Sequence, residues 1–123
     1  MDLSNQRHFN PAALMQAVGD DSHIYREMCN LFLRAVPELT SALSAAASQR
    51  DTDGIRKQAH SLRGSCMLVG AVELSELLHA AERAGIAGSV AEAAAWAEQA
   101  ATGLGCLLEE IRQALTAPGF SAC

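Results

Sequence analysis

The feature that most constrains this chain is an apolar pattern between residues 55 and 69. Its members, separated alternately by four and three residues, are Ile55, Ala59, Leu62, Cys66 and Val69. This spacing places all of them on one face of an α-helix, and a face of that kind is stable only when it is buried. The segment therefore predicts a helix of about residues 52–69 that packs against other elements on one side.

Caps, glycines and prolines divide the part of the chain before this helix. Asn10 as N-cap and Pro11 at the first helical position begin a short helix, which ends at Gly19. A long helix follows over about residues 21–49, with Asp20 or Asp21 as its cap. Pro37 lies inside it and removes one backbone hydrogen bond, so we expect a bend or a break into two helices there. The predicted buried stripe of this long helix is Ile24, Met28, Leu31, Phe32, Ala35, Leu39, Leu43 and Ala46.

The part after residue 50 is read in the same way. Asp51, Thr52 or Asp53 caps the helix of residues 52–69, and Gly70–Ala71 makes a tight connection. The following helix, over about 71–85, turns inward Leu74, Leu77, Leu78 and Ala81. Ser89 and Glu92 match a capping box at the start of the last helix. The stripe of this last helix is Val90, Ala94, Ala97, Ala101, Leu104, Leu108, Ile111 and Leu115. Gly103 and Gly105 weaken it locally, and close helix packing is one explanation for them.

Four amphipathic helices with short connections predict an all-α fold, an antiparallel up-down four-helix bundle with a short additional N-terminal helix. A chain of 123 residues forms one domain. We expect a polar N-terminal lead-in at residues 1–9, the bundle domain at 10–117 and a flexible C-terminal tail at 118–123.

Charge and cysteine usage exclude several function classes. The formal net charge of −5 argues against a protein that binds nucleic acid through phosphates. No apolar run approaches the roughly 20 residues needed to cross a bilayer, and no signal peptide is recognisable, so no membrane contact is expected. The four cysteines are scattered without a Cys-x-x-Cys pair, which favours reduced thiols and a cytoplasmic location.

A second set of residues lies on a different face of the helix of residues 52–69. His60, Arg63, Gly64 and Met67 share this face, which is turned away from the buried stripe. A glycine inside a helix costs about 1 kcal/mol relative to alanine. Gly64 therefore suggests that something large approaches the imidazole, and Arg63 can neutralise an anion there. Taken alone, His60 would be interpreted as an ordinary solvated histidine, which is the usual case on a helix surface.

The string from Ala59 to Ser65, Ala-His-Ser-Leu-Arg-Gly-Ser, followed by Gly70–Ala71, is more specific. It resembles the phosphorylation-site helix of the histidine-containing phosphotransfer (HPt) domains of phosphorelays. The resemblance extends over about residues 8–117. Its leading portion includes Phe9–Asn10, Gly19–Asp20–Asp21 and Phe32–Leu33.

The resemblance implies a role for each matching residue. His60 would be the phosphorylated nucleophile, Arg63 would stabilise the phosphoryl charge, and Glu82, 22 residues after His60, would orient the imidazole. A solvent-exposed glutamate is the alternative for Glu82. The partner-docking residues would be Lys57, Gly64, Ser65 and Met67. For two of them a structural alternative is favoured: Lys57 as a solvated surface lysine, and Ser65 as a small helix residue.

The resemblance also implies what the chain needs from others. It would be a carrier and not an enzyme with its own ATP site, and no nucleotide-binding loop is present in the sequence. It would have no cofactor of its own, because the partner receiver domain supplies Mg²⁺. The expected partners are receiver domains of hybrid sensor kinases and response regulators, and the expected state is a monomer.

Two other functions are compatible with a helical bundle. One is a non-catalytic adaptor with the same fold that binds and inhibits a receiver or kinase. The other is the dimerising phosphoacceptor domain of a histidine kinase, although these carry an acidic residue after the histidine and Ser61 follows His60 here. We expect no metal site, since Glu76 and His79 have a metal-binding spacing that occurs only once.

Overall fold

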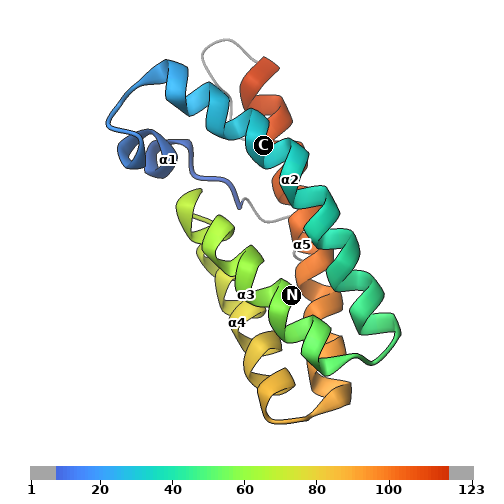
Figure 1. The fold of residues 1–123 in the computed structure, drawn as a ribbon. Coiled ribbons are helices and arrows are strands. Elements are labelled where there is room, and N and C mark those ends of the chain that lie inside the picture. Colours follow the sequence, from blue (N-terminus) through green and yellow to red (C-terminus); the bar gives the residue numbers. More distant parts are fainter. Residues whose placement is uncertain (1–7, 117–123) are drawn as a thin grey trace.

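The computed structural model describes residues 8–116, which form five helices (Figure 1). In chain order these are α1 (Pro11–Ala17), α2 (Ser22–Ser48), α3 (Thr52–Leu68), α4 (Val72–Ile86) and α5 (Val90–Thr116). Helices α2 to α5 each pack on the next, and α5 also packs on α2, which closes the bundle. The three connections, 49–51, 69–71 and 87–89, are so short that successive helices run antiparallel. The predicted all-α four-helix bundle is confirmed.

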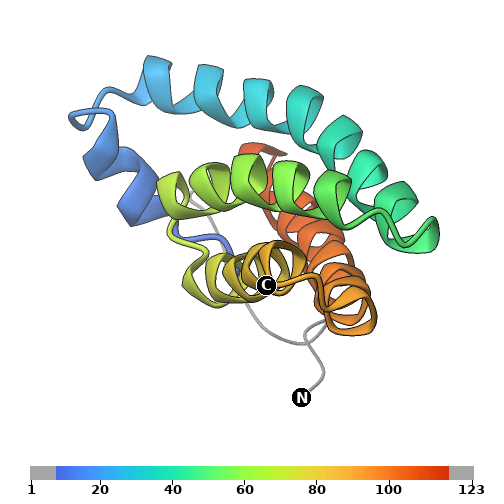
Figure 2. The same cartoon turned by 60° about the horizontal axis from the view of Figure 1, so that its bottom comes forward.

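The short helix α1 lies beside one end of the bundle, where it contacts α2 and α3 (Figure 2). Its N-cap is Asn10, whose side chain accepts a hydrogen bond from the Ala13 backbone N–H at 3.1 Å, and Pro11 is its first residue. Asp21 caps α2 and Asp51 caps α3 in the same way. The predicted starts of all three helices are therefore confirmed, each for the physical reason that its sequence suggested.

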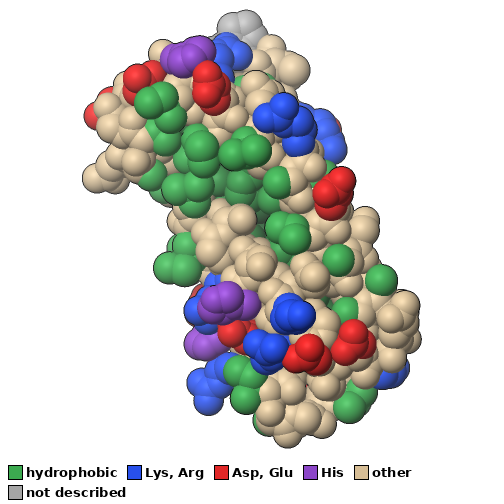
Figure 3. All heavy atoms as spheres, viewed as in Figure 1, with side chains coloured by type: hydrophobic (Ala, Val, Ile, Leu, Met, Phe, Trp, Pro, Cys, Tyr) green, Lys and Arg blue, Asp and Glu red, His purple; other side chains and the backbone are tan. Residues whose placement is uncertain are grey.

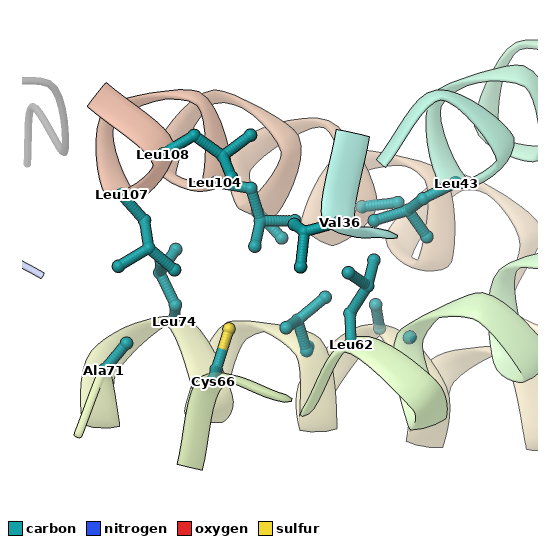
Figure 4. Close-up of a cluster of buried hydrophobic side chains, with 14 of the residues drawn as sticks. Val36, Leu43, Leu62, Cys66, Ala71, Leu74, Leu104, Leu107 and Leu108 are labelled. Carbon is teal, nitrogen blue, oxygen red and sulfur yellow. The ribbon is translucent and has the colours of Figure 1, made fainter. Parts of the chain in front are cut away.

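The core is aliphatic and is shared by all four long helices. The predicted stripe of α3 is buried along its whole length, from Ile55 to Val69. Leu62 and Cys66 of α3 point toward Val36 of α2 and Leu104 of α5 (Figure 4). Burial raises the pKa of the Cys66 thiol to about 12. The thiol therefore stays protonated at neutral pH and packs as a small apolar side chain.

The predicted stripe of α2 is only partly right in the first half of that helix. Phe32 is buried and Met28 is half-buried against the core, but Ile24 and Leu31 remain 42% and 47% exposed. Cys29 and Val36, each one residue after a predicted position, are buried instead. Both sets have helical spacing and differ by one residue, about 100° around the axis, so the period alone could not select between them. In the second half, Leu43 and Ala46 are buried as predicted.

Pro37 does not break α2, which is one helix from Ser22 to Ser48. The alternative of two separate helices is therefore wrong. The Thr40 hydroxyl, three residues later, donates a hydrogen bond of 2.8 Å to the Val36 carbonyl oxygen. The bend expected near Pro37 stays a prediction.

The inward positions of α4 and α5 largely follow the predicted pattern. Helix α4 buries Leu74, Leu78 and Ala81, and Leu77 is half-buried against the core. Helix α5 buries five predicted positions, namely Ala94, Ala97, Leu104, Leu108 and Ile111. The first predicted position, Val90, is instead mostly exposed at the start of the helix. The capping box at Ser89 and Glu92 stays a prediction.

The two glycines of α5 differ from each other. Gly103 is buried. Gly105 is exposed, and a Cβ atom built on it would meet no atom within 4 Å. Close helix packing therefore does not explain Gly105.

The end of the predicted polar lead-in belongs to the folded domain. His8 and Phe9 are buried, and the Glu110 carboxylate of α5 accepts hydrogen bonds from both of their backbone N–H groups at 2.9 Å. The Asn10 backbone N–H donates to the Val69 carbonyl oxygen, also at 2.9 Å. This strap, residues 8–10, joins α5 to the turn after α3. The rest of the predicted lead-in and the predicted tail at 118–123 lie outside the described residues.

Candidate functional site

His60 lies on the face of α3 opposite the core. Its side chain is 63% exposed, whereas Ala59 and Leu62 on either side of it are fully buried. Because the apolar stripe fixes the rotation of α3, the fold itself turns the imidazole toward solvent. Histidine, basic and acidic side chains gather over α3 and α4 on the face shown in Figure 3.

Glu82 of α4 holds the imidazole from the neighbouring helix. Its Oε2 lies 2.9 Å from His60 Nδ1, and its side chain is only 14% exposed. An ionised carboxylate only accepts hydrogen bonds, so this contact places the hydrogen of the ring on Nδ1. The lone pair is then on Nε2, the nitrogen farther from the backbone.

Arg63 completes a three-residue cluster with His60 and Glu82. Its Nη1 lies 3.4 Å from Glu82 Oε1, and the Arg63 side chain is 29% exposed. Glu82 Oε1 is buried and has no hydrogen-bond partner within residues 8–116, so the arginine supplies its nearby opposite charge. One carboxylate thus has an imidazole at one oxygen and a guanidinium at the other. The pairing of Arg63 with Glu82 was not predicted from the sequence.

The predicted docking residues lie on or beside this exposed face. Gly64 is exposed, and Met67, one turn further on, is 66% exposed. Lys57 is exposed one turn before His60, and Ser65 is half-buried. A Cβ atom on Gly64 would meet no atom within 4 Å, so the intramolecular packing does not require glycine there.

Replacing Gly64 by alanine is expected to stabilise the free protein and to impair its approach to a partner. Alanine is favoured over glycine inside a helix by about 0.5–1 kcal/mol, and nothing in the fold opposes the added methyl group. Thermal unfolding should show a higher Tm, while binding of a partner to the face around His60 should weaken. A lower Tm would show that the glycine serves the fold instead. Gly105→Ala, at another open helical glycine, is the control that raises Tm without weakening binding.

A hollow of about 400 Å³ adjoins the cluster between α3 and α4. Its lining consists of Arg63, Met67, Val72, Ser75, Glu76 and His79. Met67 and Val72 form an exposed apolar wall, and the buried Ser75 hydroxyl has no hydrogen-bond partner among the described residues. The sequence patterns did not reveal this hollow, because its residues come from two helices whose relative register they do not fix.

The other histidines and the cysteines form no comparable arrangement. His23 and His79 are exposed, and His23 Nε2 lies 2.7 Å from Glu27 Oε1. Within residues 8–116, no three His, Cys, Asp or Glu side chains are grouped to hold a metal ion. Cys29 and Cys66 are buried free thiols. None of the helices α1 to α5 has the length and apolar character of a membrane span.

Comparison with known families decides the identity of the domain. The family model of the Hpt domain matches residues 27–117. The chain belongs to the Hpt domain family. It is therefore a histidine phosphotransfer domain of the two-component phosphorelay type, and such domains are carriers and not kinases. The match does not include the leading portion of the expected resemblance, from residue 8 to residue 26.

A solved structure supports the fold of this Hpt domain. The chain is similar to histidine-containing phosphotransfer protein B (HptB) from Pseudomonas aeruginosa PAO1, with a TM-score of 0.76 and 24% identity. The alignment covers 86% of this chain and 92% of HptB. At this identity the similarity shows a common fold and nothing finer. No curated protein gave a significant match.

Proposed function

We propose that this Hpt domain accepts a phosphoryl group on His60 from a receiver-domain aspartate and passes it to the aspartate of another receiver. The observation that carries the proposal is the contact between His60 Nδ1 and Glu82 Oε2 on an otherwise open face. This contact occupies Nδ1 and leaves the lone pair of Nε2, the other ring nitrogen, available as the nucleophile. Nε2 would attack the phosphorus, an N–P bond would form, and the P–O bond to the aspartate would break.

No proton has to move in this step. The ring begins with hydrogen on Nδ1 and ends as a phosphorylated imidazolium that still carries it, while the aspartate leaves as a carboxylate. Glu82 Oε2, 2.9 Å from Nδ1, would stabilise the positive charge that the ring gains. The same contact would hold the ring in one orientation throughout the transfer.

Arg63 would balance the charge that arrives with the phosphoryl group. A guanidinium has five N–H donors, and the contact with Glu82 Oε1 at 3.4 Å engages one nitrogen of the three. The remaining donors are available to phosphoryl oxygens, with Glu82 keeping the group beside the ring. The Mg²⁺ ion of the reaction would come from the receiver domain, and this chain would work as a monomer without a cofactor of its own.

The docking surface would be the exposed face around His60. It includes Lys57, Gly64, Ser65 and Met67, where an open glycine and an exposed methionine favour close, reversible contact. A net charge of −5 makes nucleic acid an unsuitable partner.

The test is phosphoryl transfer from purified receiver domains. A panel of receivers from hybrid kinases and response regulators is phosphorylated and incubated with the protein and Mg²⁺. We expect label on this chain in an acid-labile, alkali-stable form, mapped to His60 by mass spectrometry. Binding of a receiver without any transfer would favour the adaptor function instead. Neither binding nor transfer across the panel would contradict both functions.

Replacing Glu82 by alanine is expected to slow phosphoryl transfer about tenfold to a hundredfold, because the ring loses the contact that orients it. Glu82→Gln keeps one acceptor oxygen and should restore part of the rate. The measurement is the rate of transfer from one receiver at several pH values, together with the Tm. Glu73→Ala, at an exposed glutamate of the same helix, is the matched control. Equal rates for Glu82→Ala and the control would show that Glu82 does not position the ring.

A further inference from the structure

The hollow between α3 and α4 begins where the His60 cluster ends. Arg63 belongs to both, since it contacts Glu82 on one side and lines the hollow on the other. Met67 lies one turn after Arg63 on α3 and forms part of the wall. A partner that reaches His60 Nε2 with a carboxylate would therefore cover the opening of the hollow as well.

The wall of the hollow is unusually apolar for a solvent-exposed surface. Met67 and Val72 are 66% and 65% exposed and come from different helices, yet they meet at this one site. Exposed apolar side chains that gather beside a polar site are a common mark of an interaction surface. A methionine side chain also adapts its shape to what it contacts, which suits a surface that binds several related partner proteins.

The lining also contains a polar group that the fold leaves unsatisfied. The Ser75 hydroxyl is buried without a hydrogen-bond partner among residues 8–116, although most buried polar groups have one. Rotation about one side-chain bond moves this oxygen between staggered positions. A hydrogen-bond acceptor that a partner brings into the hollow could therefore bind the Ser75 hydroxyl. Residues 8–116 of the domain itself offer it no acceptor.

We infer that this hollow is a recognition subsite for the receiver domain, and that it takes one apolar side chain of the receiver together with an adjacent carbonyl oxygen. The apolar side chain packs between Met67 and Val72, and the carbonyl oxygen accepts a hydrogen bond from Ser75. This assignment rests on the proposed function, because the receiver is the partner that His60 brings to this face. The subsite would contribute to which receivers exchange phosphoryl groups with this domain.

A substitution that fills the hollow tests the assignment. Glu76 is exposed and lines the hollow, so Glu76→Trp places a bulky side chain at its opening without disturbing the core. Glu73→Trp is the matched control, since Glu73 is an exposed glutamate of the same helix that does not line this hollow. Both variants remove one negative charge and add one tryptophan.

The readout is the receiver concentration at half-maximal transfer, measured with the receiver that transfers fastest to the wild type. We expect Glu76→Trp to raise this concentration about tenfold or more, with the maximal rate within about twofold of wild type and Glu73→Trp unchanged. Equal values for the two tryptophan variants would overturn the subsite while leaving the proposed function intact. Failure of the wild type to bind or transfer with any receiver would overturn both.

Ser75→Ala tests the hydrogen bond separately. Because the Ser75 hydroxyl has no hydrogen-bond partner among the described residues, its removal should leave the Tm unchanged or raise it. The half-maximal receiver concentration should nevertheless rise about fivefold, the effect of one hydrogen bond. A lower Tm with unchanged transfer would give Ser75 a structural role and remove it from the subsite.

Discussion

Replacing His60 by glutamine is expected to abolish phosphoryl transfer to this domain without unfolding it. Glutamine has no nucleophilic nitrogen, but its amide N–H can still donate a hydrogen bond to Glu82 as the imidazole does. The side chain is 63% exposed, so the change in the free energy of unfolding should stay within about 0.5 kcal/mol. The measurement is acid-labile label on the protein after incubation with a phosphorylated receiver and Mg²⁺.

His23→Gln is the matched control for this variant. His23 is also an exposed helical histidine next to a carboxylate, with Nε2 2.7 Å from Glu27 Oε1, but it lies on α2 and has no arginine–glycine pair. Its replacement should leave transfer unchanged. Residual label on His60→Gln, with loss of label on a different histidine variant, would move the phosphorylation site away from α3.

The largest effect on stability is expected from Glu110→Ala. The buried Glu110 carboxylate accepts hydrogen bonds from the backbone N–H groups of His8 and Phe9, and truncation removes the acceptor of these hydrogen bonds. Hydrogen bonds to a charged group contribute about 1.5–3 kcal/mol each, and unpaired buried donors add a further cost. If part of this loss is recovered by release of the strap to water, the free energy of unfolding falls by about 3 kcal/mol. This corresponds to a Tm lower by roughly 10–15 °C.

The neighbouring residue provides a control of the same type. Glu109 is exposed, and its ion pair within residues 8–116 is with Arg112 of the same helix, at 3.1 Å. Such surface pairs contribute little, so Glu109→Ala should change the free energy of unfolding by less than about 0.5 kcal/mol. Glu110→Gln should fall between the two, since its amide retains one acceptor oxygen. Similar Tm values for both alanine variants would show that the strap contributes nothing to stability.

The sequence predicted the helices well where only one apolar face was available. The stripe of α3 from Ile55 to Val69 has no competing set one residue away, and it is buried throughout. In the first half of α2, Leu31 and Phe32 are both apolar and were both predicted to be buried, but only Phe32 is. Which of them packs inward depends on how α2 lies against its neighbours. Periodicity within one helix does not contain that information.

The contacts that join distant parts of the chain were predicted least well. The hydrogen bond from the His8 backbone to Glu110 links residues 102 positions apart. Its signal in the sequence is a glutamate three residues after Leu107 and four before Ala114, on an apolar side of α5. His60 and Arg63 could be placed on one exposed face from spacing alone, whereas Glu82 was selected through the family resemblance. The Arg63–Glu82 pair and the hollow depend on the register of α3 against α4, which only the folded structure provides.

The number of residues between His60 and Glu82 determines how α4 is aligned along α3. The two residues are 22 positions apart, and the turn between their helices, 69–71, contains Gly70 in a left-handed conformation with φ +71°. The turn is held by the hydrogen bond from the Asn10 backbone N–H to the Val69 carbonyl oxygen. A Cβ atom on Gly70 would lie only 2.7 Å from Asn10 Cβ. Neither the length nor the shape of the turn can therefore readily change. One inserted residue would rotate α4 by about 100° relative to its present position and separate the carboxylate from the ring. Other sequences can share little else with this one. A histidine and an acidic residue 22 positions apart, with such a turn between them, would still indicate that the contact between imidazole and carboxylate is preserved.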